Sequence, residues 1–221
     1  LHDALPIFSN GSGSAIFLFS LPFLARMYDP DAFGLQSYYV SIMALFMPIS
    51  SLKGEFAIVT SSTPAESRQT VKLCSLVSLV MSVLMGSMVL LISSTTPWGF
   101  SGDGQIWLVA LVALNFFVDA QITIYGKYAL SKKLFVYIAI SGLVKPLIFV
   151  TYATLSYLLM GQQQNALIIG FFVSSLVTLL LYLPLALEIF AKADSGLKYR
   201  DLAKRHRDFF TFGAMGSFFN G

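Results

Sequence analysis

Residues 73–92 read LCSLVSLVMSVLMGSMVLLI and include no charged side chain. One α-helix that crosses the hydrocarbon core of a bilayer needs about 20 mostly apolar residues, and this stretch supplies them. A membrane-spanning β-strand would instead alternate apolar and polar side chains over about ten residues. No such alternation runs through residues 76–91. The stretch therefore predicts a transmembrane helix.

Five further stretches have the same character: residues 8–25, 34–52, 106–125, 134–159 and 165–187. Another apolar run opens near Thr211. The chain is 56% hydrophobic and only 11% charged, against about 25% charged in a typical soluble domain. A soluble fold would lack polar cover for its surface. We therefore expect an all-α, polytopic membrane helix bundle of six transmembrane helices plus the start of a seventh.

The positive charges alternate along the chain. Twelve of the 14 lysines and arginines follow the second, fourth and sixth apolar stretches. Of the other two, Arg26 follows the first stretch and Lys145 lies inside the fifth. Cytoplasmic loops of membrane proteins carry an excess of basic residues. The pattern predicts that the amino terminus and the even-numbered loops are cytoplasmic.

Two segments carry signals for the start of a helix. Asp29 can cap a helix whose first residue is Pro30, since proline suits that position. Thr63 can cap a second helix that begins at Pro64, with Glu66 at the capping-box position.

Ionisable side chains at membrane depth are costly, and they are candidates for function. Asp119 lies in the fourth stretch, with Asn115 four residues earlier on the same helix face, whereas Gln121 is rotated away. Lys145 lies in the fifth stretch, directly before Pro146. Asp119 and Lys145 either face a polar interior that binds a charged substrate or a coupling ion, or form a structural ion pair. A third interpretation is that Lys145 reaches a membrane interface.

The first stretch carries a polar segment that includes Asn10. It either lines a cavity at the cytoplasmic entrance or allows close helix packing through small residues. His2 and His206 are too few and too isolated for a metal site. No catalytic arrangement or cofactor motif is present, and a net charge of +3 gives little reason to expect nucleic-acid binding. We expect neither an enzyme nor a protein with a cofactor.

Three short motifs resemble those of the polysaccharide biosynthesis, or oligosaccharide flippase, family (Wzx-type). Residues 21–34, LPFLARMYDPDAFG, are similar to the family's first extracytoplasmic turn, and residues 55–59, EFAIV, to its E-x-A-I-V motif. Residues 204–210, KRHRDFF, are similar to the segment before helix seven. The chain departs from the family at residues 53–54, where Lys-Gly replaces Arg-Tyr, and at Phe210, which replaces proline. The matching positions with a structural or topological role are Arg26, Pro30, Gly34, Glu55 and Phe209.

The resemblance implies one lobe of a two-lobed transporter of the superfamily that includes the MATE exporters and the peptidoglycan lipid flippase. Residues 8–190 would then be the amino-terminal six-helix lobe, 191–210 a basic cytoplasmic linker and 211–221 the truncated start of helix seven. Residues 1–7 would be a non-native leader. The carboxy-terminal lobe would be missing from this chain.

The implied function is translocation of an undecaprenyl-diphosphate-linked oligosaccharide across the bacterial inner membrane, for O-antigen, capsule or exopolysaccharide assembly. The expected cavity residues are Asn10, Asn115, Asp119 and Lys145. Expected partners are the lipid-linked oligosaccharide, the bilayer, the missing lobe, and glycan polymerase and chain-length machinery. The alternatives are a MATE-like cation-coupled exporter, a glycan polymerase or ligase subunit, and a membrane scaffold.

Overall fold

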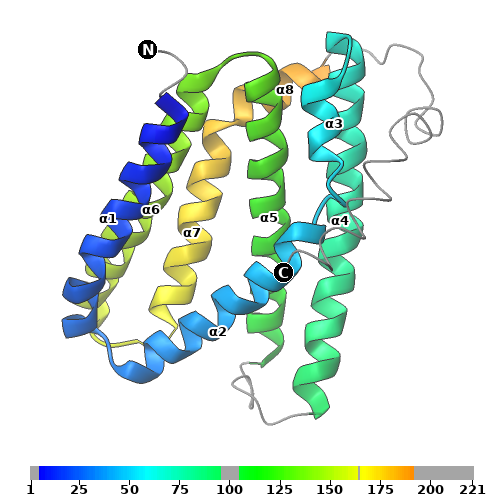
Figure 1. Ribbon diagram of the computed structural model, residues 1–221. Helices are drawn as coiled ribbons and strands as arrows, with labels where there is room; N and C mark the ends of the chain where they lie inside the picture. The colour runs from blue at the N-terminus through cyan, green and yellow to red at the C-terminus, as the bar shows by residue number, and fades with distance from the viewer. Residues whose placement is uncertain (1–4, 96–104, 164, 192–221) are drawn as a thin grey trace. The chain divides into compact units, whose positions relative to one another are not determined.

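The computed structural model describes the backbone of residues 5–95, 105–163 and 165–191, and the side chains of residues 12–92, 106–163 and 165–191. All regular structure in these residues is helical, as the sequence predicts (Figure 1). The helices are α1 (Leu5–Met27), α2 (Pro30–Phe46), the 3₁₀ helix η2 (Met47–Ile49), α3 (Glu55–Thr60), α4 (Pro64–Thr95), α5 (Gln105–Ser131), α6 (Phe135–Met160), α7 (Ala166–Leu181) and α8 (Leu183–Ala191).

Four of these helical segments are long and apolar enough to cross a membrane. They are Pro30–Ile49, Pro64–Ile92, Ile106–Ser131 and Phe135–Met160. A fifth span is reached if α7 and α8, which are bent by 53° relative to each other, are taken together. The described part of α1 with side chains, Ser12–Met27, is apolar but shorter than a full span. The described residues therefore contain four to five candidate spans, and the predicted six are not confirmed. The predicted start of a seventh helix lies outside the described residues, as do residues 192–210 of the predicted linker and residues 1–4 of the predicted leader.

Helix α4 has polar residues inside and apolar residues outside. Ser78 and Ser82 are buried, with exposed fractions of 0% and 5%. The exposed large side chains of the same helix are all apolar: Leu76, Leu79, Val80, Val83, Leu84, Met88, Leu90, Leu91 and Ile92. A helix in water shows the opposite distribution. Small and polar residues at helix contacts, with apolar residues facing outward, are typical of helices packed in lipid. Several long apolar helices of this kind indicate a multi-pass membrane protein.

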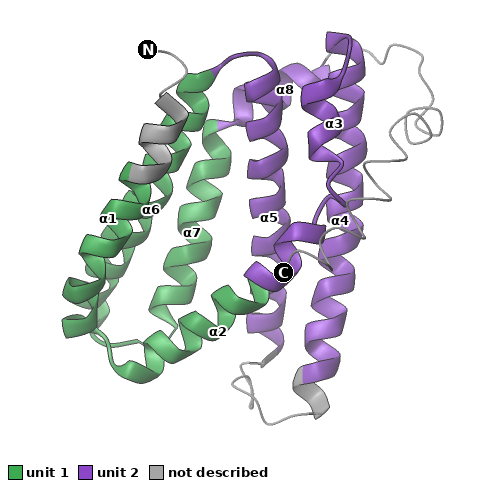
Figure 2. Cartoon of the chain, viewed as in Figure 1, with its two compact units in different colours: residues 1–43, 135–181 green, residues 44–134, 182–221 purple. Residues whose placement is uncertain are grey.

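The chain divides into two compact units, which are described separately (Figure 2). Unit 1 contains residues 1–43 and 135–181, and in it α6 packs against both α1 and α7. Its core near the α1–α2 turn is apolar and aromatic. The buried members are Leu24, Met27, Tyr28, Ala32, Phe149, Ala153, Ala166 and Leu167.

Close packing of α1 on α6 depends on glycine. A Cβ atom added to Gly13 would overlap the backbone carbonyl of Gly142. Small residues of this kind allow two helix backbones to approach closely in a membrane. Gly13 belongs to the polar segment near Asn10, so close packing is the interpretation that the structure supports there.

Unit 2 contains residues 44–134 and 182–221, and its main element is the antiparallel pair of α4 and α5. Short helix α3 packs against both of them, and α8 contacts both as well. Gly86 of α4 faces Ala113 of α5, where an added Cβ would lie 2.9 Å from the Ala113 Cβ.

Both predicted helix starts are confirmed. Helix α2 begins at Pro30, and the backbone N–H of Ala32 donates to the Asp29 carbonyl at 3.1 Å. Helix α4 begins at Pro64, and the N–H of Glu66 donates to Thr63 Oγ1 at 3.2 Å. The Glu66 carboxylate in turn accepts the N–H of Ser62 at 3.1 Å, so the first turn of α4 is capped from both directions.

Candidate functional site

The candidate site lies on one face of α5, within the span Ile106–Ser131. Asn115 is completely buried and Asp119 is 8% exposed. Residues four apart on an α-helix lie on the same face, so the structure brings these two predicted site residues together. The Thr123 hydroxyl donates to the main-chain carbonyl of Asp119 at 3.0 Å, one turn further along the same helix.

Asn115 is unusual because both ends of its amide lack a partner. Within the described part of the chain, neither Nδ2 nor Oδ1 makes a hydrogen bond. Leaving a buried polar group unpaired costs about 1–3 kcal/mol, and native structures contain few such groups. Gln69, Tyr128 and Ser175 each have one buried atom in the same condition. Asn115 differs because a donor and an acceptor are both unpaired on one side chain.

Gln121 has a different role from its two neighbours. Its Oε1 accepts the Ser75 hydroxyl at 2.9 Å, and its Nε2 donates to Ser78 Oγ at 2.8 Å. Successive residues turn by about 100° around an α-helix, so Asp119 lies nearly opposite Gln121. Gln121 therefore joins α5 to α4, whereas Asn115 and Asp119 occupy the other side of α5. The sequence prediction that Gln121 is rotated away agrees with this geometry.

Lys145 belongs to unit 1 and is described by its neighbours there. It lies on α6 directly before Pro146, and the helix continues without interruption to Met160. The side chain is half-buried, and its Nζ lies 4.8 Å from the ring centroid of Phe171 on α7. This is a cation–π contact, worth about 0.5–2 kcal/mol depending on how far the ammonium is desolvated. The ion pair between Asp119 and Lys145 stays a prediction.

The other predicted residues divide between helix ends and segments that are not described. Arg26 is exposed in the last turn of α1, Pro30 is the first residue of α2, and Gly34 is exposed. Glu55 is the first residue of α3, and its carboxylate accepts the Ser51 hydroxyl. Asn10 lies in the backbone of α1, but its side chain is outside the described residues, as is Phe209.

Sequence reasoning assigned no role to Tyr28, although it quoted the residue within a motif. Tyr28 is 3% exposed, and its hydroxyl donates to the Ala153 carbonyl on α6 at 2.7 Å. Its ring meets that of Tyr157 edge-on, with centroids 5.8 Å apart. The position of Tyr28 directly before the capping Asp29 was the only signal that could have indicated this anchoring role.

Neither a metal site nor the best-defined apolar cavity coincides with these residues. The described residues contain no group of three or more His, Cys, Asp or Glu side chains that could hold a metal ion. A cavity of about 330 Å³ in unit 1 is lined by Val136, Tyr137, Ile140 and Leu181. It includes none of the predicted site residues. The chemistry available at the site is therefore hydrogen bonding by Asn115 and charge pairing by Asp119.

Comparison of the chain with protein-family models, with curated proteins and with solved structures found no match.

Proposed function

We propose that this chain is one lobe of a membrane transporter, a flippase that moves an undecaprenyl-diphosphate-linked oligosaccharide across the bacterial inner membrane. The observation that carries the proposal is the buried polar pair on α5. Asn115 and Asp119 lie inside an apolar helix that is long enough to cross a bilayer, where polar groups are expensive and mark substrate or ion pathways. The three sequence motifs supply the class of substrate.

The unpaired amide of Asn115 suits a sugar. Its side chain offers two donors and one acceptor, and a sugar hydroxyl can donate and accept at once. The amide is fully buried in the conformation described. Binding therefore requires α5 to move relative to the residues that cover it. Alternating access of two lobes around a site near the bilayer midplane provides such a motion.

Lys145 is the proposed partner of the diphosphate. Its ammonium rests on the face of Phe171, and an aromatic ring attracts a cation without neutralising it. A diphosphate carries full negative charge and forms stronger, charge-assisted hydrogen bonds. The ammonium can therefore exchange the ring for the substrate, while the lipid tail of the substrate stays in the bilayer.

A MATE-like exporter of small molecules is the second candidate, and Asp119 is the residue that favours it. A buried carboxylate in a transmembrane helix pairs with a cation or carries a proton. This candidate predicts cation-driven efflux of small molecules and no effect on surface glycan.

Complementation of a flippase-deficient bacterium with the full-length protein that contains this chain tests the proposal. We expect Asp119→Asn, Asn115→Leu and Lys145→Ala each to abolish surface glycan at normal protein levels, and Lys145→Arg to retain part of it. The matched control is Asp31→Asn, which removes an exposed carboxylate from the first turn of α2 and should leave the glycan unchanged. Wild-type glycan in both Asp119→Asn and Lys145→Ala would overturn the proposal.

A further inference from the structure

Helix α8 turns away from α7 close to where a span would end. Helix α7 has 16 residues, which at 1.5 Å per residue is about 24 Å, and the hydrocarbon core of a bilayer is about 30 Å thick. With its bend of 53°, the nine residues of α8 add only about 8 Å along the direction of α7. Helix α8 therefore covers the level at which hydrocarbon gives way to headgroups.

Helix α8 has an apolar face on each side. Leu185 and Ile189 are buried against the protein. On the outside, Leu183, Leu187 and Phe190 are 49%, 61% and 56% exposed. These three residues are spaced i, i+4 and i+7, so they form one stripe along the helix. A stripe of this kind fits the boundary between acyl chains and headgroups.

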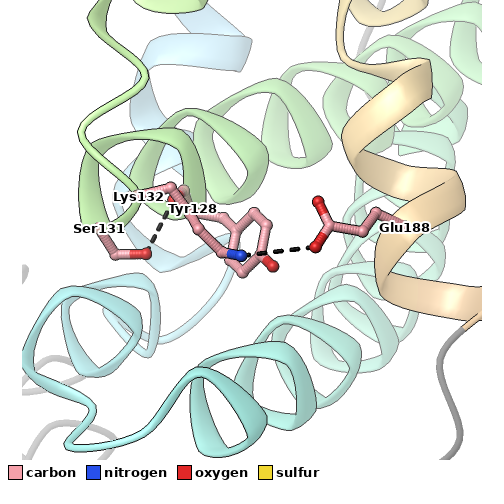
Figure 3. A network of polar contacts seen from close by, with 4 residues as sticks. All are labelled: Tyr128, Ser131, Lys132 and Glu188. Atoms are coloured by element: carbon pink, nitrogen blue, oxygen red, sulfur yellow. Dashed lines mark hydrogen bonds and ion pairs between the residues drawn. The ribbon is translucent and has the colours of Figure 1, made fainter.

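Lysines from α4 and α5 reach this helix within unit 2. Lys132 Nζ lies 3.4 Å from Glu188 Oε1 (Figure 3), and Lys72 Nζ lies 5.9 Å from the ring centroid of Phe190. Figure 3 also shows the Lys132 side chain passing the ring of Tyr128, whose centroid lies 5.4 Å from its Nζ. Helix α8 is thus bordered by ammonium groups.

The acidic groups at this end of unit 2 are already engaged. Glu55 accepts from Ser51, Glu66 accepts from Ser62, and Glu188 pairs with Lys132. Two further basic residues border the same lysines. Lys133 directly follows Lys132, and Arg68 lies one helical turn before Lys72 on α4. Neither makes an ion pair within the described residues. Positive charge therefore remains uncompensated beside the apolar stripe.

We propose that α8 and the adjoining basic ends of α4 and α5 form an interfacial surface that binds the headgroups of anionic phospholipids. The stripe of Leu183, Leu187 and Phe190 enters the acyl boundary, and Arg68 and Lys133 attract the phosphates. Juxtamembrane basic residues gain about 1 kcal/mol each from an anionic surface, which is about fivefold in local lipid concentration. This surface does not depend on the proposed transport function, because it requires only that the protein is in a bilayer.

Energy transfer from a single tryptophan to pyrene-labelled lipids measures the surface directly. The two native tryptophans are replaced (Trp98→Phe, Trp107→Phe), and Phe190→Trp reports on α8 in the protein reconstituted into mixed phosphatidylcholine and phosphatidylglycerol vesicles. The matched control is Leu91→Trp, a site 67% exposed toward the other end of α4, about 28 Å along the helix from Lys72.

From the tryptophan on α8 we expect several-fold greater transfer to pyrene-phosphatidylglycerol than to pyrene-phosphatidylcholine, and from the control tryptophan on α4 a ratio near one. Adding Arg68→Gln and Lys133→Gln should bring the α8 ratio close to one, with the α4 ratio unchanged as proof of folding. Equal ratios at the two sites would overturn the proposal, as would an unchanged α8 ratio in the variant without the two basic residues. Emission from the α8 tryptophan typical of water would overturn it as well.

Discussion

The two compact units are built from different kinds of contact. In unit 1, aromatic rings on α1, α6 and α7 pack together, and the Phe149 centroid lies 5.7 Å from that of Phe17 and 6.4 Å from that of Phe171. In unit 2, the amide of Gln121 joins α4 and α5 through two serines. Lipid tails are as apolar as a leucine side chain, so burial alone drives no association in a bilayer. Unit 1 therefore relies on shape and close approach, and unit 2 relies on directed hydrogen bonds.

The largest expected effect breaks the shape of unit 1. Gly13→Val places side-chain atoms where the carbonyl of Gly142 lies, so α1 and α6 must separate. We expect a loss of about 3 kcal/mol in the free energy of unfolding, measured in mixed detergent micelles. Gly34→Ala is the control because nothing lies within 4 Å of the added Cβ. Equal stability of the two variants would show that the close approach is not required.

The next effect removes the polar join of unit 2. Gln121→Leu deletes both hydrogen bonds to α4, and we expect a loss of about 1–2 kcal/mol in the free energy of unfolding. A double-mutant cycle with Ser78→Ala isolates the coupling between the two side chains. Ser87→Ala serves as the control, since that exposed hydroxyl bonds to its own helix. A coupling energy of zero would contradict the assignment of Gln121 as the join.

A smaller effect concerns the polar anchor that Tyr28 provides in the aromatic unit. Tyr28→Phe keeps the ring contact with Tyr157 but removes the hydrogen bond to the Ala153 carbonyl. We expect a loss of about 1 kcal/mol in the free energy of unfolding. Ser41→Ala, which removes an exposed hydroxyl bonded within α2, should change nothing. If both variants match the wild type, shape alone accounts for unit 1.

The smallest effect lies at the surface of unit 2. Lys132 and Glu188 are each about a third exposed, and exposed ion pairs contribute at most about 1 kcal/mol. We expect Glu188→Gln to lower the free energy of unfolding by less than this, and high salt to remove the difference. A large, salt-independent loss would mean that the pair is a structural join comparable to Gln121.

Sequence reasoning predicted the all-helical fold and the starts of α2 and α4, because spans and caps are local patterns. The number of spans was beyond its reach. The apolar stretch at residues 165–187 gave no indication of the bend between Leu181 and Leu183, which depends on how α8 meets α4 and α5. Periodicity put Asn115 and Asp119 on one face and Gln121 on another. It did not reveal that two serines would satisfy Gln121, since those partners come from another helix.

The most direct test of the central claim, that these helices cross a membrane in the predicted orientation, is labelling of single cysteines at the two ends of α6. In a Cys74→Ser background, Lys133→Cys and Gln162→Cys are treated with a membrane-impermeant maleimide in intact spheroplasts and again after permeabilisation. The account predicts that the Gln162→Cys protein reacts in intact spheroplasts and that the Lys133→Cys protein reacts only after permeabilisation. Equal labelling of both in intact spheroplasts would contradict the crossing, and the reverse pattern would contradict the orientation.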